Sequence, residues 1–285
     1  MQKIWVCGAR GQIGQAVNDV VDKLEFEMLD TDVDDLDVTD TDEVLRFGEM
    51  NRPDIIINCS GMTDISSCEE NPSQAFKVNA LGARNLAIVA AKMQAKMVQL
   101  STDDVFDGKS TAPYTEFDIT NPGTVYGKSK LAGENYVKEF TTKHFIVRST
   151  WVYGKGQNFI NGFLKKVDAG EQLSIASDQF GSPTSANELA RFLLHLVHTS
   201  EYGTYHATNK GVCSRYAFAQ EILKMTGKTA SMQPVPTVMS DFSKVRPAYA
   251  VLDNFIMSMV PIYDFPDWQD SLREYLEERG LYHAE

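Results

Sequence analysis

Short apolar segments alternate with longer segments of helical periodicity through the first half of this chain. The candidate strands lie at 3–7, 26–29, 55–59, 96–100 and 145–148, separated by candidate helices at 12–23, 41–50, 72–92 and 125–140. Segment 55–59 reads IIINC, a largely apolar run expected of a strand covered on both faces. Strand–helix alternation of this kind produces βαβ units with right-handed crossovers. The sequence therefore predicts an α/β protein with a doubly wound parallel sheet of the Rossmann type.

The alternation becomes less regular after Trp151. Further candidate helices there lie at 186–198, 216–226 and 268–278. We predict that residues 1–150, with about 181–208 returning to the sheet, form a dinucleotide-binding domain. Residues from about 151–180 and 209–285 would form a smaller C-terminal substrate-binding lobe. Such a lobe would cover the carboxyl edge of the sheet, where ligands bind in folds of this class.

Charge and composition exclude several classes of partner. The net charge is −12, which argues against a nucleic-acid surface, because that requires a basic patch. A small anionic ligand is compatible with it, since helix N-termini and one or two cations can hold a phosphate. The four cysteines and five histidines show no metal-type spacing, so we expect no metal. No apolar run approaches the roughly 20 residues of a membrane span and no signal peptide is recognisable, so we expect a soluble cytoplasmic monomer or homodimer.

A glycine-rich loop follows the first candidate strand. Gly8, Gly11 and Gly14 stand in the segment GARGQIG, directly before a candidate helix. Three such glycines provide a tight turn, close approach of the backbone to a pyrophosphate, and tight packing of helix on strand. The spacing alone also fits an ordinary glycine-rich turn into a helix. Its position in the first βαβ unit favours a dinucleotide cofactor.

An acidic residue about 20 positions further on should bind the ribose hydroxyls of that cofactor. Asp32 is the candidate, with Asp30 as the neighbouring alternative, while most of the remaining acidic run is expected to be solvated. No Arg or Lys occurs between Lys23 and Arg46, so the 2′-phosphate of NADPH would meet negative charge without a partner. We therefore predict NADH as the preferred cofactor and NADPH as the alternative.

A tyrosine and a lysine four residues apart predict general-acid chemistry. Tyr126 and Lys130 would lie on one face of a helix, one turn apart. Free tyrosine has a pKa of about 10 and is a weak acid at neutral pH. An ammonium at about 4 Å, with an effective dielectric of about 20, contributes about 4 kcal/mol, or about three pKa units. Thr102, after the strand candidate 96–100, would help to polarise a carbonyl. A surface Tyr with Lys at i+4 is common by chance. Here, however, the glycine loop, Thr102 and the Tyr126–Lys130 pair follow one another in the expected order, which makes a chance occurrence improbable.

The sequence resembles the dTDP-4-dehydrorhamnose reductase family of extended short-chain dehydrogenases/reductases. The likeness extends from Cys7 to about Leu276 and rests on the segments GARGQIG, NCSGMT, STDDVFDG, YGKSKLAGE, RSTWVYG, DQFGSPT and RPAYAVLD. The pairing of STD-x-VFDG with DQ-x-GSPT is more specific than a dinucleotide fingerprint. The resemblance implies NAD(P)H-dependent reduction of the 4-keto group of dTDP-6-deoxy-L-lyxo-4-hexulose, which gives dTDP-L-rhamnose.

The resemblance also implies roles for individual residues. Thr102, Tyr126 and Lys130 would be the catalytic residues. The cofactor would be bound by Gly8, Gly11, Gln12, Ile13, Gly14, Asp37, Val38, Cys59, Ser60, Gly61, Asn79, Tyr126 and Lys130. The sugar nucleotide would be bound by Thr102, Asp104, Val105, Trp151 and Arg246, with Ser149 and Thr150 around the nicotinamide and sugar.

Two departures from the family pattern concern the sugar pocket. Asp104 stands where the family usually has tyrosine, and the segment with Met62 and Ser66 (SGMTDIS) replaces the usual AAAYT-x-VD. These departures keep two alternatives open. The first is a reductase, epimerase or dehydratase of another NDP-keto-sugar, which Asp103 beside Asp104 allows. The second is a non-catalytic regulatory subunit similar to that of methionine adenosyltransferase.

Overall fold

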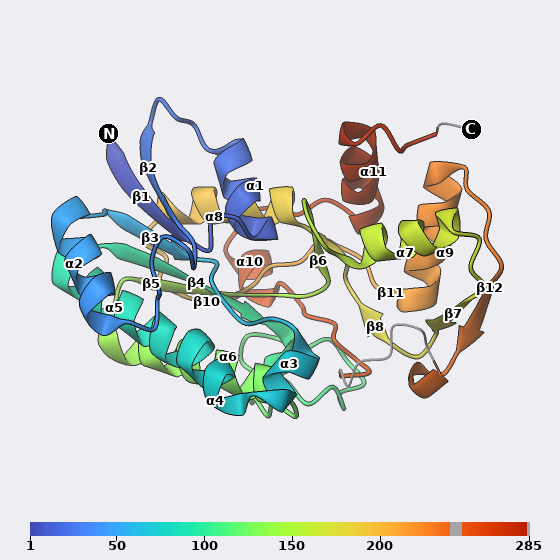
Figure 1. Ribbon diagram of the computed structural model, residues 1–285, viewed down its shortest axis with the longest axis horizontal. Helices are drawn as coiled ribbons and strands as arrows, with labels where there is room; N and C mark the ends of the chain where they lie inside the picture. Colours follow the sequence, from blue (N-terminus) through green and yellow to red (C-terminus); the bar gives the residue numbers. More distant parts are fainter. Residues whose placement is uncertain (240–246, 284–285) are drawn as a thin grey trace.

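A six-stranded sheet forms the centre of the larger part of the molecule (Figure 1). The computed structural model describes residues 1–239 and 247–283. The strands of the sheet are β1 (Gln2–Cys7), β2 (Phe26–Thr31), β3 (Ile55–Asn58), β4 (Lys96–Thr102), β5 (His144–Ser149) and β10 (Gly203–His206). Their order is β10-β5-β4-β3-β1-β2, and every neighbouring pair is parallel. This confirms the predicted doubly wound α/β fold, in which the strand order reverses between β1 and β3.

Helices cover both faces of the sheet (Figure 1). They are α1 (Gln12–Val20) and α8 (Ala186–Val197) on one face, and α2 (Thr41–Asn51), α5 (Ala83–Met93) and α6 (Val125–Phe140) on the other. Alternate residues of each strand face opposite helix layers because side chains alternate along a strand. Ile4 and Val6 of β1 therefore pack in the core under α1 and α8, whereas Trp5 packs in the core under α2 and α5.

The segment predicted as one helix over 72–92 is interrupted. It consists of α4 (Pro72–Phe76), a π-helical stretch η1 (Lys77–Gly82) and α5. Pro72 begins α4, where its missing N–H costs nothing. Single turns of π-helix occur often at functional sites. This one carries Asn79, which is buried and faces the site described below.

The C-terminal half adds a smaller part with its own core, on the right in Figure 1. That core contains the aromatic residues Phe163, Phe218, Trp268 and Tyr275, and it is a separate cluster from the two cores that flank the sheet. The elements here are α7 (Phe159–Asp168), β7 (Leu173–Ala176) paired with β12 (Met232–Val235), α9 (Arg215–Thr226) and α11 (Trp268–Glu278). From these separate cores we propose the division drawn from the sequence, with a dinucleotide-binding part and a substrate-binding lobe.

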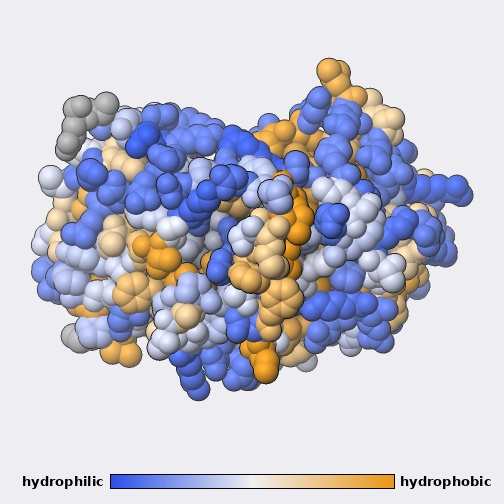
Figure 2. Space-filling view, turned by 180° about the vertical axis from the view of Figure 1, so that it is seen from behind, coloured by the Kyte–Doolittle hydropathy of each residue, from blue (hydrophilic) through white to orange (hydrophobic). Residues whose placement is uncertain are grey.

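The remaining elements are short. They are α3 (Ile65–Glu70), the 3-10 turns η2 (Asp103–Val105) and η3 (Thr237–Met239), α10 (Phe255–Met259), and the pairs β6 (Val152–Tyr153) with β9 (Thr184–Ser185) and β8 (Phe180–Gly181) with β11 (Cys213–Ser214). The face opposite to Figure 1 is indented between the two parts along its upper edge (Figure 2). No helix of the described residues has the length and apolar character required to cross a membrane.

Candidate active site

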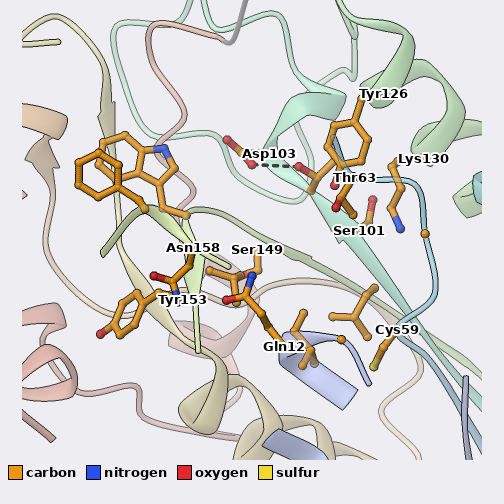
Figure 3. A pocket seen from close by; sticks show the side chains of 18 of the residues that line it. Gln12, Cys59, Thr63, Ser101, Asp103, Tyr126, Lys130, Ser149, Tyr153 and Asn158 are labelled. Carbon is orange, nitrogen blue, oxygen red and sulfur yellow. Dashed lines mark hydrogen bonds between the residues drawn. The ribbon is translucent and has the colours of Figure 1, made fainter. Parts of the chain in front are cut away.

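A cavity of about 690 Å³ lies between the carboxyl ends of the central strands and the smaller lobe (Figure 3). One wall comes from the glycine loop and the segments that follow β3 and β4, namely Gly11, Gln12, Ile13, Cys59, Ser60, Gly61, Thr63, Leu100, Ser101, Thr102 and Asp103. Tyr126 and Lys130 of α6 complete that side. The opposite wall comes from Ser149 and the lobe, with Trp151, Val152, Tyr153, Gln157, Asn158, Phe159, Gln179, Arg215 and Phe218.

The glycine loop packs tightly against the neighbouring backbone. Gly8 has a φ of 76°, and a Cβ on it would lie 2.7 Å from the amide nitrogen of Ser60. A Cβ on Gly14 would lie 2.6 Å from the Cα of Ala9, so α1 packs directly on the loop. Any side chain at either glycine would collide with backbone.

The start of α1 also fits an anionic ligand. Its N-cap residue Gly11 supplies no side-chain hydrogen bond to the first amides of the helix. The N-terminal amides of a helix carry partial positive charge and bind phosphate well. Beside them, the Oε1 atom of Gln12 is buried without a hydrogen-bond partner. The N-terminal amides of α1 fit the pyrophosphate of a dinucleotide cofactor, whereas the Gln12 oxygen is an acceptor and fits a donor group.

The residue after β2 interacts with the glycine loop. The Arg10 backbone N–H donates to Asp32 Oδ2 over 2.8 Å, and the Arg10 guanidinium contacts Asp34 and Asp35 at 2.7 and 2.8 Å. The sequence-based premise that no cation lies near Asp32 is therefore wrong. That premise considered only cations adjacent in sequence, whereas pairing of β1 with β2 brings Arg10 to the acidic run.

Two residues predicted to border the adenine do not line the cavity. Asp37 is exposed, and Val38 is buried against Gly82, whose missing Cβ would lie 2.8 Å from a Val38 methyl group. The Val38 carbonyl accepts a hydrogen bond from the Asn85 side chain at 3.0 Å. The structure therefore places Val38 in the packing between the acidic run and η1, and its contact with adenine stays a prediction.

Tyr126 and Lys130 come together at the start of α6, as Figure 3 shows. The helix begins at Thr124, whose hydroxyl accepts the Gly127 N–H over 2.9 Å. Both side chains are largely buried, with 8% of Tyr126 and 5% of Lys130 exposed. Burial lowers the pKa of the Lys130 ammonium to about 8, although Glu134 acts in the opposite direction. The tyrosine hydroxyl and a lysine of perturbed pKa thus occupy the same cavity.

Thr102 is buried at the end of β4, on the wall that also holds Tyr126. Its Oγ1 atom lies 3.0 Å from a carboxylate oxygen of Asp103 and accepts the backbone N–H of Asp104 at 3.2 Å. These two contacts fix the hydroxyl at the cavity wall. The three residues predicted to be catalytic are therefore brought together, although they lie in two separate segments of the chain.

Asn79 supports the loop that follows β3. Its amide nitrogen donates to the Met62 carbonyl at 3.0 Å and to the Ser129 hydroxyl at 2.9 Å, and its Oδ1 accepts the Met62 N–H at 2.8 Å. Gly61 passes so close that a Cβ on it would lie 3.1 Å from Asn79 Oδ1. Asn79 thus links the loop to α6 from behind the cavity wall.

The lobe side of the cavity contains a stack of side chains that the sequence did not indicate. The Arg215 guanidinium lies 3.4 Å from the ring centre of Trp151 and 4.7 Å from that of Phe159. Trp151 has a φ of 46°, which is unusual for a residue with a side chain and is found mostly at functional sites. A Cβ on Gly181 would lie 2.6 Å from the Trp151 ring, so the GSPT segment gives the indole its space.

A family model described as RmlD substrate binding domain matches residues 1–280. The sequence is also 32% identical to a dTDP-4-dehydrorhamnose reductase of Aggregatibacter actinomycetemcomitans, over 96% of this chain and 98% of that protein. The chain belongs to the dTDP-4-dehydrorhamnose reductase family. It is likewise 35% identical to the spore coat polysaccharide biosynthesis protein SpsK of Bacillus subtilis, over 98% of this chain and 99% of that protein.

Solved structures of family members have the same fold. A dTDP-4-dehydrorhamnose reductase of Clostridium acetobutylicum is 40% identical and superposes with a TM-score of 0.95, covering 98% of this chain and all of that one. A dTDP-4-dehydrorhamnose reductase of Bacillus anthracis, solved in complex with NADP, is 35% identical with a TM-score of 0.95 and the same coverage. The resemblance first seen in the motifs is therefore confirmed over the whole chain.

Two of the predicted sugar-binding residues lie outside the cavity lining. Asp104 is 1% exposed and Val105 is fully buried, and neither lines the cavity, because the chain turns into η2 directly after Thr102. Val105 packs with Phe106 and other core residues. Arg246 lies outside the described residues. Binding of the sugar by these three residues stays a prediction.

Proposed function

We propose that this protein is a NAD(P)H-dependent reductase that converts dTDP-6-deoxy-L-lyxo-4-hexulose into dTDP-L-rhamnose. The observation that carries this proposal is the meeting of Thr102, Tyr126 and Lys130 in one cavity beside a phosphate-type glycine loop. Membership of the dTDP-4-dehydrorhamnose reductase family supports the choice of substrate.

In the proposed reaction the sugar carbonyl lies against Tyr126 and Thr102. Tyr126 donates its phenolic proton to the carbonyl oxygen, and the Thr102 hydroxyl hydrogen-bonds the same oxygen as negative charge develops on it. The Lys130 ammonium stabilises the phenolate that remains. A bound nicotinamide cofactor supplies the hydride that reduces C4 of the sugar. The glycine loop and the start of α1 would hold the cofactor's pyrophosphate, and Asp32 its ribose.

The direct test combines the purified protein with NADPH or NADH and enzymatically prepared dTDP-6-deoxy-L-lyxo-4-hexulose. We expect loss of the absorbance of the reduced nicotinamide and formation of dTDP-L-rhamnose. Oxidation with another 4-keto-sugar but not with this one would replace the proposed substrate. Cofactor binding without oxidation of any keto-sugar nucleotide would favour the regulatory alternative.

The choice between NADH and NADPH depends, in our proposal, on Arg10. Its contacts with Asp34 and Asp35 are exposed, and exposed ion pairs contribute at most about 1 kcal/mol. Arg10 can therefore leave them and bind a 2′-phosphate, which the acidic run would otherwise repel. We expect the protein to use NADPH as well as NADH.

Replacing Arg10 with glutamine tests this expectation. We expect Arg10→Gln to raise the KM for NADPH about tenfold, the effect of about 1.4 kcal/mol, and to change that for NADH less than about threefold. The exposed Arg46 of α2 offers a charge-matched control, Arg46→Gln, with no selective effect. Equal changes with both cofactors would contradict the role of Arg10 at the 2′-phosphate.

A further inference from the structure

A buried ion pair lies one helical turn beyond the candidate catalytic lysine. Glu134 follows Lys130 on α6 and is fully buried. Its carboxylate accepts two hydrogen bonds from the Arg148 guanidinium of β5, from Nε at 2.9 Å and Nη2 at 2.7 Å. The Ser101 hydroxyl of β4 donates a third hydrogen bond to it at 2.5 Å. Ser101 itself lines the cavity, so this carboxylate lies directly behind the cavity wall.

We propose that Glu134 is a positioning residue, which holds Lys130 as a charged ammonium beside Tyr126. The inference rests on the proposed function, because it assigns the acid of that reaction to Tyr126. Tyr126, Lys130 and Glu134 occupy positions i, i+4 and i+8 of one helix, so each lies one turn from the next.

Lys130 requires a counter-charge because its surroundings favour the neutral amine. Burial lowers its pKa, and the groups that raise it again are Glu134 and Cys59. Burial in turn raises the pKa of the Cys59 thiol to about 12, so Cys59 is uncharged at neutral pH. Asp103 lines the same cavity and lies against Thr102. Glu134 therefore acts on Lys130 through space, as a buried carboxylate one helical turn away.

The charge of Glu134 is itself secured from the other side. Arg148 remains protonated at any ordinary pH, and its fork geometry suits a carboxylate. His206 of β10 lies 3.5 Å from Arg148, but burial lowers its pKa to about 3, so it adds no competing charge. Lys138 approaches from the surface at 3.9 Å. The Glu134 carboxylate is thus paired with Arg148 and lies one helical turn from the buried Lys130.

The titration of Tyr126 provides a test that needs neither cofactor nor substrate. Tyrosinate absorbance would be followed against pH, and the curve of Tyr126→Phe subtracted to isolate Tyr126. We expect a wild-type midpoint well below the ordinary value of about 10. In Glu134→Gln/Arg148→Met, which removes both charges of the pair, Lys130 loses its proton at lower pH. Tyr126 then loses its cationic neighbour, and its midpoint should rise by about one unit or more.

Three further variants separate positioning from general destabilisation. Glu134→Asp keeps the charge and should keep the depressed midpoint. Glu188→Gln removes another buried carboxylate, which pairs with Arg191 on α8 and does not line the cavity, and should lower stability without moving the midpoint. Ser101→Ala removes one hydrogen bond to Glu134 but leaves its charge and its pair with Arg148, so the midpoint should stay depressed.

The measured midpoints distinguish a failure of the role of Glu134 from a failure of the proposed function. A wild-type midpoint of about 10 would contradict the tyrosine acid of the proposed function itself. A depressed wild-type midpoint that stays unchanged in the double variant would overturn only the role of Glu134. If the double variant does not unfold cooperatively, the single variant Glu134→Gln decides, and an unchanged midpoint there overturns the proposal.

Discussion

Replacing Tyr126 with phenylalanine should lower kcat for keto-sugar reduction by about 10²–10⁴-fold, the contribution of a positioned general acid. The substitution removes the phenolic oxygen and keeps the ring, which packs with Ile65, Cys68 and Ala75. The Kd for NADPH should therefore change less than about threefold, since the glycine loop and α1 are untouched. Single-turnover kinetics and a cofactor-binding titration measure the two quantities separately.

The same helix provides a matched control for that experiment. Tyr136 lies on α6 and is only partly buried, with its ring 6.3 Å from that of Phe140. Tyr136→Phe makes the same chemical change away from the cavity and should leave kcat within about twofold of wild type, because surface changes have small effects. A Tyr126→Phe variant with near-normal kcat would remove Tyr126 from the mechanism.

Most of the sheet could be predicted from hydrophobic pattern alone, because buried parallel strands are apolar over their whole length. The strand β3 (IIIN) is the clearest case, and all its residues are buried. No strand was predicted at β10, although the segment 181–208 that contains it was expected to return to the sheet, because GTYH is short and mostly polar. Its identity depends on pairing with β5, a contact made across more than fifty residues of sequence. The break of the 72–92 helix by η1 likewise has no local signal.

The candidate site was likewise predictable where it rests on local motifs, and not where it depends on contacts between distant segments. The glycine loop and the Tyr126–Lys130 pair are visible because each is a short pattern whose spacing carries the chemistry. Arg10 and Arg215 were missed, since the first reaches the acidic run through strand pairing and the second reaches Trp151 through the lobe. Glu134 did have a signal, because it continues the four-residue spacing of Tyr126 and Lys130.

Gly127→Ala should lower both stability and turnover, although replacing glycine with alanine inside a helix usually raises stability. Alanine inside a helix is normally more favourable than glycine by about 1 kcal/mol. Gly127, however, packs on η2, where an added Cβ would overlap the carbonyl oxygen of Asp104 and lie 2.8 Å from its carbonyl carbon. Backbone cannot rotate away as a side chain can, so we expect a loss of about 1–3 kcal/mol in the free energy of unfolding.

Turnover should fall as well, because Gly127 lies between the two segments that carry the catalytic groups. The clash pushes the start of α6, with Tyr126, away from η2, which follows Thr102 directly. A displacement of about 1 Å can cost about a hundredfold in rate. Gly123→Ala is the matched control, since nothing lies within 4 Å of its added Cβ. Chemical denaturation and kcat should be near wild type for Gly123→Ala. If Gly127→Ala unfolds at a lower denaturant concentration but keeps full kcat, the separation of Tyr126 from Thr102 is not critical to the reaction.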